Sequence, residues 1–529
     1  MDENIYFREW IHNWNWGMRT ALFLILMFSI LQFSLFSLTQ NYVISYFGAQ
    51  SEDVTFSIQV TYISLLFSLP LQVRFLNYFN TRKYLITSLL FGIIINLMLM
   101  GTRDIYVFII LRFLLGLVIS FIAGGMLTMI FSRLHDNKKQ AVGYSVFYGT
   151  LLGSSVFAGV PSAWVIDNMD WKMIYYIAIL LQVISIIIVF VIIRSEPKQR
   201  KFPLHQIDWK SYIMMGSGML AVAYLMVYGA KNYWFEDRSM IYALLLSILF
   251  LGLFVIRQLN SKRPFIHFTV FKSTRFVTGL FLLAFFYGFK DTINLVYSYI
   301  NTTAQWSTFD YMKLAACNIS GMAVTMYLAS QLIQDRRFGI RFFLVSGFGC
   351  MLIFNYWMYN IISPDLSFTD LMLPISLQGI AIGLLFVPIA TFILTAAPVT
   401  TGISGSLIAG NVRFFTTLNS FTGYYTLQLF YNQHYKEQFL EHLTPNDINY
   451  TDRLSTLTQS YVSRGYSASE SSVLAQSSIM QSVKTQSQLM TSQSIFLLVA
   501  AALGILIVII LVFPFFSRKW NNLTLKVTS

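Results

Sequence analysis

The sequence predicts an all-helical protein that crosses a membrane many times. Hydrophobic residues make up 56% of its 529 residues and charged residues only 11%, whereas about a quarter of the residues are charged in an average soluble protein. The apolar residues form long runs, and about 20 of them in a row are enough for a helix to cross the hydrocarbon core. We expect about fourteen spans, at approximately 19–46, 56–75, 84–101, 105–131, 141–166, 173–194, 211–229, 239–257, 276–300, 311–333, 341–361, 369–396, 404–430 and 493–516.

The charges of the loops predict how the spans are oriented. Every second loop except the one near Pro398 is basic, as shown by Arg82 and Lys83 after the second span and by Arg336 and Arg337 after the tenth. The loops between them are acidic, beginning with Glu52. Because cytoplasmic loops collect Lys and Arg, we expect both termini in the cytoplasm. These loops also account for the net charge of +13, so no nucleic-acid partner is implied.

Two segments lie outside the predicted spans. Residues 1–18 are acidic and aromatic, which predicts a cytoplasmic or interfacial segment before a first span that is retained in the mature protein. Residues 431–492 form a polar insert rich in Ser and Gln, in which apolar residues recur at loose helical spacing. We expect one or two amphipathic helices there, outside the membrane. This insert is either a solvated cap or a docking surface for a periplasmic or extracellular partner.

The ninth span holds the most informative residues. Lys290 and Asp291 lie near its middle, and Asp291 is the only carboxylate deep inside a predicted span. A charge at mid-depth costs roughly 2.5–3.5 kcal/mol and persists where it faces the protein interior or water. Asp291 is therefore the first candidate for carrying a proton, with Lys290 or the substrate competing for its charge. The alternative is a static ion pair, although neighbouring side chains on a helix point about 100° apart.

Further candidates for binding the substrate are polar or aromatic residues elsewhere in the predicted spans. Arg413 either pairs with Asp291, binds an anionic substrate or bonds to helix carbonyls. Gln32 cannot titrate, so it more plausibly orients the substrate or bonds to a neighbouring helix. Tyr287 and Tyr297 suit a flat, apolar or cationic ligand, but packing between helices or against lipid is the simpler explanation.

Patterns for catalysis and metal binding are missing from the sequence. None of the six His residues lies deep in a predicted span, and the two Cys residues lie in apolar runs. The sequence contains neither a Cys/His metal-binding spacing nor a P-loop. We therefore expect no enzyme, no metal and no cofactor, and any transport would draw its energy from an ion gradient.

The loops after the second and tenth spans are similar to each other, as in transporters built from repeated halves. Each is a short basic turn after a span, at 69–85 and 330–344. In the second loop, Asp335 can pair with an arginine such as Arg336 or lie at a helix N-terminus. Gly339 can relieve a tight turn there.

The order of these features resembles the major facilitator superfamily, specifically the fourteen-span drug:proton antiporters of the EmrB/QacA type. The sequence RFLLG in the fourth span is similar to the family's Arg-x-x-x-Gly motif and places it at Arg112 and Gly116. DNMDWKMIYYI at the end of the fifth span resembles the family's Asp-x-x-x-Trp-Arg-x-x-Phe ending, with Lys172 in place of Arg. The basic linker at 263–279 and the Arg-containing segment at 404–420 also resemble the family.

Besides Lys172, the sequence departs from the family at three places. The loop at 69–85 has lost the glycines and the Asp of the family's Gly-x-Leu-Ala-Asp-Arg-x-Gly-Arg-Arg pattern. The fifth span lacks the Gly-Pro and Gly-Gly pairs of the antiporter motif, but Gly153, Gly159 and Pro161 remain among the small residues that permit close helix packing. Gln32 occupies the place in the first span where the family often carries an acidic residue.

The resemblance implies two six-helix bundles that provide alternating access, at 19–194 and 276–516, with a two-span linker at 195–275 and a cytoplasmic tail at 517–529. It implies proton-coupled efflux of amphipathic drugs or related compounds across the cell membrane, which is the inner membrane in a Gram-negative cell. Arg112 would relay protons, take part in gating or belong to a structural network. A periplasmic adaptor and an outer-membrane channel are implied as partners.

The sequence leaves two other functions open. A dedicated exporter of an endogenous lipid or metabolite is favoured by the eroded motifs. A membrane scaffold or sensor that kept the fold without transport is disfavoured by the charges at mid-span, because an inert scaffold has little reason to bury them.

Overall fold

The computed structural model describes residues 7–8, 14–36, 40–132, 164–165, 168–194, 204, 207–261, 264–334, 338–396 and 402–512. Within these residues the chain is helical, and one isolated bridge between Phe7 and Ile193 is the only β pairing. The predicted all-helical class is therefore confirmed. The fifth predicted span, 141–166, lies almost entirely outside the described residues.

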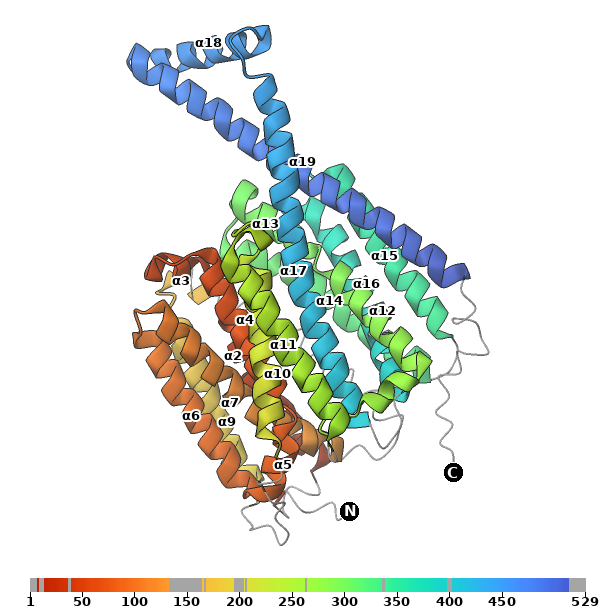
Figure 1. Cartoon of the computed structure of the whole chain (residues 1–529). Helices are drawn as coiled ribbons and strands as arrows, with labels where there is room; N and C mark the ends of the chain where they lie inside the picture. Colours follow the sequence, from red (N-terminus) through yellow and green to blue (C-terminus); the bar gives the residue numbers. More distant parts are fainter. Residues whose placement is uncertain are drawn as a thin grey trace.

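The helices of the N-terminal half pack around one buried apolar core, to which Leu89, Phe108 and Ile119 belong. α4 packs along α7, and α6 packs along both α7 and α9. Figure 1 shows this bundle in red to gold. Its helices are α2 (Asn15–Leu35), α3 (Gln40–Phe47), α4 (Ser51–Ser68), α5 (Leu71–Tyr78), α6 (Thr81–Gly101), α7 (Ile105–Ser132) and α9 (Met173–Ile192).

The predicted first span, 19–46, is too long. It corresponds to α2 followed by the separate short helix α3. α2 has 21 residues, which at about 1.5 Å per residue already matches a hydrocarbon core of about 30 Å.

The helices of the C-terminal half form a second bundle, with α14 against α16 and α15 against α19 as its most extensive contacts. Its core includes Phe286, Phe348 and Phe414. The helices are α12 (Thr274–Lys290), α13 (Ile293–Tyr299), α14 (Thr308–Gln334), α15 (Ile340–Ile361), α16 (Phe368–Ala396), α17 (Gly402–Glu441) and α19 (Ala468–Val512), and a π-helix, η5 (Ile300–Ala304), follows α13.

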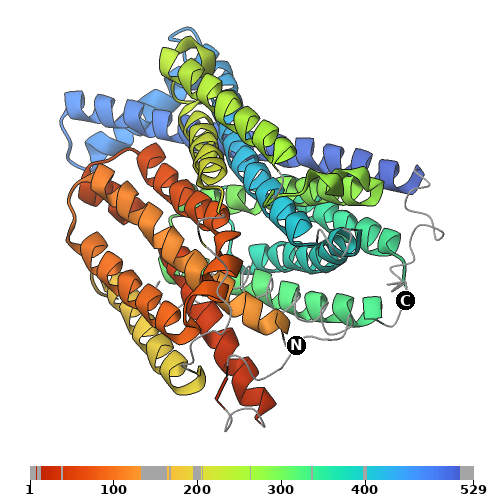
Figure 2. The same cartoon turned by 60° about the horizontal axis from the view of Figure 1, so that its bottom comes forward.

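Two further helices, α10 (Trp209–Tyr228) and α11 (Arg238–Asn260), pack against each other and lie along the junction of the bundles. α10 contacts α4 of the first bundle and α17 of the second, and the pair runs beside both in Figures 1 and 2. The short helix η3 (Trp234–Glu236) connects the pair, and η4 (Phe268–Lys272) leads into α12.

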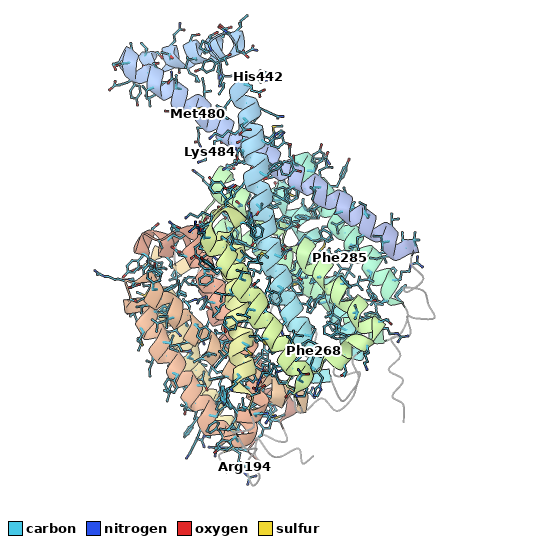
Figure 3. The ribbon with its side chains drawn as sticks, viewed as in Figure 1. Arg194, Phe268, Phe285, His442, Met480 and Lys484 are labelled. Carbon is cyan, nitrogen blue, oxygen red and sulfur yellow. The ribbon has the colours of Figure 1, made fainter. Side chains whose placement is uncertain are left out.

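The polar insert at 431–492 forms an arm that projects from one end of the molecule (Figure 1). α17 and α19 continue into it without a break, and α18 (Ile448–Ser463) joins them. Figure 3 shows His442, Met480 and Lys484 on this arm, away from the bundles. The helices expected in this insert are present, and two of them extend helices of the C-terminal bundle.

By length and composition, nine described segments are able to cross a membrane: α6, α7, α9, α10, α11, α12 with α13, α15, α16 and α19. The long helices α4, α14 and α17 are more polar than these segments, and the apolar part of α2, Gly17–Phe33, is shorter. All four pack among the nine segments. In α4, the buried hydroxyls of Ser57, Thr61 and Ser64 donate to carbonyls three or four residues earlier. These bonds satisfy the hydroxyls without water, as the interior of a membrane bundle requires.

Candidate functional site

The ninth predicted span is interrupted at its two charged residues. α12 ends at Lys290, Asp291 and Thr292 form the junction, and α13 begins at Ile293. At the junction, the amide of Asn294 donates to the carbonyl oxygen of Asp291 at 3.0 Å, an i→i+3 bond that tightens the turn. The ninth predicted span therefore consists of two helices rather than the single continuous helix expected.

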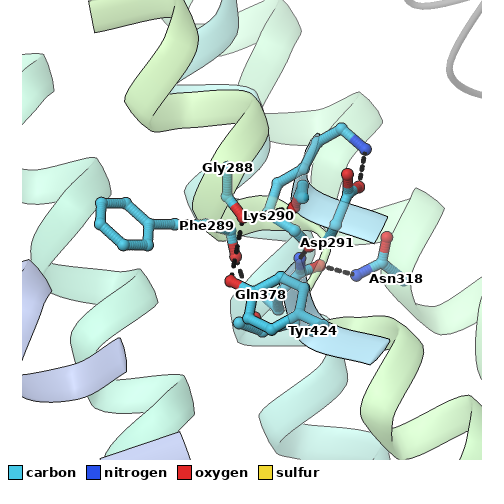
Figure 4. A network of polar contacts seen from close by, with 9 residues as sticks. Gly288, Phe289, Lys290, Asp291, Asn318, Gln378 and Tyr424 are labelled. Atoms are coloured by element: carbon cyan, nitrogen blue, oxygen red, sulfur yellow. Dashed lines mark hydrogen bonds and ion pairs between the residues drawn. The ribbon is translucent and has the colours of Figure 1, made fainter. Parts of the chain in front are cut away.

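Side chains from other helices satisfy the carbonyls that the break leaves without helical partners. The carbonyl oxygen of Gly288 accepts from Ser420 Oγ at 2.9 Å and from Tyr424 OH at 3.0 Å. The carbonyl oxygen of Lys290 accepts from Gln378 Nε2 at 2.9 Å. Figure 4 shows this network. Because unsatisfied carbonyls are costly in an apolar surrounding, these bonds hold the break in place.

A further residue, Asn318 of α14, orients Gln378. Its Nδ2 atom donates to Gln378 Oε1 at 2.6 Å and to the carbonyl oxygen of Ile375 at 2.9 Å. Sequence reasoning missed Asn318, Gln378, Ser420 and Tyr424. The available signal was a polar side chain inside a predicted span, which alone does not say what the side chain touches.

Lys290 and Asp291 form an ion pair at the junction, with 2.5 Å between Nζ and Oδ1. The Lys290 side chain is 18% exposed and that of Asp291 is 8% exposed. Asp291 is the C-cap of α12 and has ψ of −1°, outside regular helical geometry. The structure therefore answers a question that the sequence left open, since the two neighbours do pair.

Tyr287 lies near two cations, Lys290 of this pair and Arg413. Its ring centroid is 5.4 Å from Lys290 Nζ and 5.1 Å from Arg413 Cζ, within the range of cation–π attraction. Arg413 Cζ also lies 6.0 Å from the ring of Tyr62. Tyr62 belongs to α4 and packs edge-on against Phe414 at 5.3 Å. Arg413 and its neighbours thus connect the charged pair to the N-terminal bundle.

Tyr297 occupies a different place from the other predicted binding residues. It lies on α13, beyond the junction, and its ring packs edge-on against Tyr311 of α14 at 4.7 Å. The structure therefore brings together Lys290, Asp291, Tyr287 and Arg413 and places the Tyr297 ring against α14.

Gln32 and Arg112 lie in a second polar cluster, inside the N-terminal bundle. Gln32 Oε1 accepts from Gln182 Nε2 at 2.8 Å, and Gln182 Oε1 accepts from Asn96 at 3.3 Å. The guanidinium of Arg112 lies 4.0 Å from the ring centroid of Phe36. Gln32, Asn96 and Arg112 line one small cavity.

Gly116 and Gly339, both predicted to have structural roles, differ in whether the structure requires a glycine at their position. A Cβ on Gly116 would lie 1.9 Å from Ser64 Oγ and 2.3 Å from the carbonyl oxygen of Thr61, so the close approach of α7 and α4 depends on a glycine. Gly339 is the N-cap of α15 with φ of −78° and ψ of 162°. Any residue adopts that conformation, so the backbone of Gly339 itself does not require a glycine.

The remaining predicted residues lie outside the described part of the chain: Gly153, Gly159, Pro161, Asp335 and Arg336. Among the described residues, no group of three or more His, Cys, Asp or Glu side chains is arranged to hold a metal ion.

A model of the Major Facilitator Superfamily matches residues 22–416. The chain belongs to this superfamily. The Multidrug export protein EmrB of Haemophilus influenzae is 25% identical over 447 residues, which cover 81% of this chain and 82% of that protein. The Probable multidrug resistance protein EmrY of Escherichia coli is 21% identical, covering 77% and 78%. The Fatty acid resistance protein FarB of Neisseria gonorrhoeae is 23% identical, covering 72% and 73%.

Solved transporter structures share the fold at low sequence identity. A POT family transporter in complex with 5-aminolevulinic acid has a TM-score of 0.57 at 10% identity, covering 93% of this chain and 96% of that one. A peptide transporter POT in complex with sulfate has a TM-score of 0.55 at 11% identity, covering 92% and 95%. The predicted major facilitator fold is confirmed, and the protein is a multi-pass membrane transporter rather than an enzyme.

Proposed function

We propose that this major facilitator protein exports amphipathic compounds in exchange for protons, by alternating access between its two bundles. The observation that carries the proposal is the buried Lys290–Asp291 ion pair at a helix break. A buried carboxylate in a membrane bundle is by default a functional residue. The relatives named as multidrug export and resistance proteins support the class of substrate.

In the proposed mechanism, Asp291 binds either a proton or a cationic group. Protonation removes the negative charge of Asp291 and so weakens its bond to Lys290 Nζ. A cationic substrate that binds the deprotonated carboxylate competes with the proton for the same oxygens. Mutually exclusive binding of substrate and proton is what an antiporter requires.

Arg413 and Tyr287 are the proposed substrate-binding residues beside this pair. Tyr287 offers a ring face that already lies near two cations. Arg413 lies over rings from both bundles, since Tyr287 belongs to α12 and Tyr62 to α4. A change in the spacing of the bundles therefore changes the surroundings of Arg413 directly. We retain Gln32 and Tyr297 as substrate contacts on their side-chain chemistry, and Arg112 as a proton-coupling residue on the family resemblance.

The proposed topology places both termini in the cytoplasm and the arm on the outer side. The basic loops of the sequence support this orientation. The bundles then occupy 19–194 and 276–516, with the inserted pair in 195–275. In a Gram-negative inner membrane the arm would extend into the periplasm, where an adaptor leading to an outer-membrane channel could bind it.

A second candidate is export of one endogenous lipid or metabolite. The similarity to a protein named for fatty acid resistance favours it. The two candidates differ in the range of compounds that bind, so a panel of amphipathic cations and fatty acids distinguishes them.

Proton release on addition of amphipathic cations to the purified protein, in weakly buffered detergent, tests the mechanism. We expect release from the wild type and none from Asp291→Asn. The double variant Lys290→Gln/Asp291→Asn should also release none, and it leaves no unpaired charge at the site. Asp310→Asn is the matched control, because the Asp310 side chain is 47% exposed, and it should release protons like the wild type.

Two outcomes contradict the proposal. Equal release from the wild type and Asp291→Asn would move proton coupling to another residue. No release from the wild type with any compound of the panel would leave proton antiport unsupported.

A further inference from the structure

A small cavity inside the N-terminal bundle contains a buried cation for which the described residues provide no counter-ion. Arg112 is 1% exposed and is among the largest fully buried side chains of the protein. Among the described residues, no acceptor lies within hydrogen-bonding distance of its Nε and Nη2 atoms. A buried charge is costly unless an opposite charge and hydrogen bonds compensate for it.

The residues around the cavity do not provide this compensation. Its lining includes Gln32, Asn96 and Tyr175 besides Arg112, and none of the described lining residues is Asp or Glu. The Phe36 ring, 4.0 Å from Arg112 Cζ, attracts the guanidinium, but a neutral ring does not cancel the charge and does not serve the in-plane N–H groups.

Tyr175 contributes a third donor to the same cavity. Its hydroxyl is buried and likewise has no partner within the part of the chain that the structure describes. The neighbouring amide oxygens of Gln32 and Gln182 already accept hydrogen bonds, from Gln182 and Asn96. Three donors and one positive charge thus face a space whose lining offers no carboxylate. An acceptor that carries negative charge would complement these donors.

We propose that Arg112 and Tyr175 bind a small monovalent anion of the size of chloride in this cavity. The cavity has room for a water-sized guest rather than for an organic substrate. Water accepts hydrogen bonds but leaves the charge of Arg112 uncompensated, so a halide is the better ligand. This site lies in the N-terminal bundle and is separate from the Lys290–Asp291 pair proposed for proton exchange.

Thermal unfolding of the full-length protein in detergent tests the anion site, with sodium chloride or bromide compared with sodium gluconate at equal ionic strength. Gluconate is too large for the cavity. We expect chloride and bromide to raise the Tm of the wild type by about 2 °C in a saturable way, as a ligand that binds only the folded state does. Arg112→Gln should lose this halide dependence.

Gln32→Glu provides the sharper variant, because it places a carboxylate in the lining of the same cavity. The new side chain can still accept the hydrogen bond from Gln182, so the fold is retained. We expect its Tm in gluconate to reach at least that of the wild type in chloride, with no further rise on adding halide. Gln438→Glu and Arg453→Gln change exposed residues of the arm and should keep the wild-type halide dependence.

Gln32→Glu tests the anion site even if Arg112→Gln does not fold. Equal Tm values of the wild type in chloride and gluconate would overturn the proposal. So would an unchanged halide effect in Gln32→Glu, which would place the anion elsewhere on the protein. Proton release through Asp291 is measured separately, so either hypothesis can fail without the other.

Discussion

Gln378 connects the helix break to the rest of the C-terminal bundle, because it donates to the Lys290 carbonyl and accepts from Asn318. We expect Gln378→Leu to lower the free energy of unfolding by about 1–3 kcal/mol, the cost of leaving buried polar groups without partners. Unfolding of the purified protein in detergent measures the loss. Gln438→Leu is the matched control on the exposed part of α17 and should change stability by less than about 0.5 kcal/mol. Similar losses in both variants would contradict this role of Gln378.

The residues of this site could be predicted only in part. Lys290 and Asp291 stand out in the sequence because charges are rare in an apolar run. The side chains that bond to the backbone at this pair do not stand out in the sequence. Gln378, Ser420 and Tyr424 lie 88, 132 and 136 residues from the carbonyls that they bond. A single sequence shows that these residues are polar but not which carbonyl each one reaches.

At the scale of elements, the contact of α14 with α16 depends on glycines. A Cβ on Gly379 would lie 1.9 Å from the carbonyl oxygen of Asn318, and one on Gly383 would lie 2.0 Å from Thr325 Oγ1. We expect Gly379→Val to lower the free energy of unfolding by about 1–3 kcal/mol or more, because the helices must move apart. The stability of Gly349→Val, measured in the same way, is the control, since nothing lies within 4 Å of that position.

If Gly379→Val is no less stable than Gly349→Val, the close approach of α14 and α16 contributes nothing to the free energy of unfolding. The sequence carries a signal for this contact. Gly379 and Gly383 form a Gly-x-x-x-Gly motif in an apolar span, a pattern typical of close helix packing. Hydropathy located most spans, but it did not place the break at Asp291 or the end of α2, because both depend on local backbone bonding rather than on average polarity.

A second element-scale prediction concerns the inserted pair of helices. Asp208, the N-cap residue of α10, lies 2.8 Å from Arg257 Nη2 of α11. The hydrogen bonds from Arg257 hold the pKa of the Asp208 carboxyl below its usual range. A lowered folded-state pKa stabilises the protein above the unfolded pKa, which is about 3.9, and this stabilisation is lost as pH falls through the folded value.

We therefore expect the Tm of the wild type to fall more steeply between about pH 5 and pH 3 than that of Asp208→Asn. The exposed Asp452 of α18 provides the control, and Asp452→Asn should follow the wild-type curve. Parallel pH curves for wild type and Asp208→Asn would show that the Asp208–Arg257 pair does not contribute to acid stability.

At the scale of the whole molecule, α10 is bonded to both bundles. Tyr228 OH donates to Asp53 Oδ1 of α4 at 2.5 Å, and Thr422 Oγ1 of α17 donates to the carbonyl oxygen of Met226 at 3.0 Å. A rocking motion of one bundle against the other must therefore lengthen one of these bonds or carry α10 along. The sequence places these helices between the bundles in chain order, but it does not show which helices they touch.

The arm contributes little to the core of the C-terminal bundle. α18 contributes no buried residue, whereas the C-terminal core takes Phe414 and Leu418 from α17 and Leu489 with later residues from α19. Ser487 Oγ donates to Asn432 Oδ1 at 3.3 Å, so the two long helices are side by side at the base of the arm. Residues 436–483 can be replaced there by a Gly/Ser linker of about ten residues.

We expect this shortened protein to keep the wild-type Tm and the Asp291-dependent proton release, because every residue of the ion-pair network remains. Export of the same compounds by intact cells then tells what the arm does. Lost export with retained proton release would identify the arm as a docking surface for a partner, since the transporter itself still binds its ligands. Retained export would identify it as a solvated cap. A lower Tm or lost proton release would show instead that the bundle depends on the arm, contrary to the separation of its core from α18.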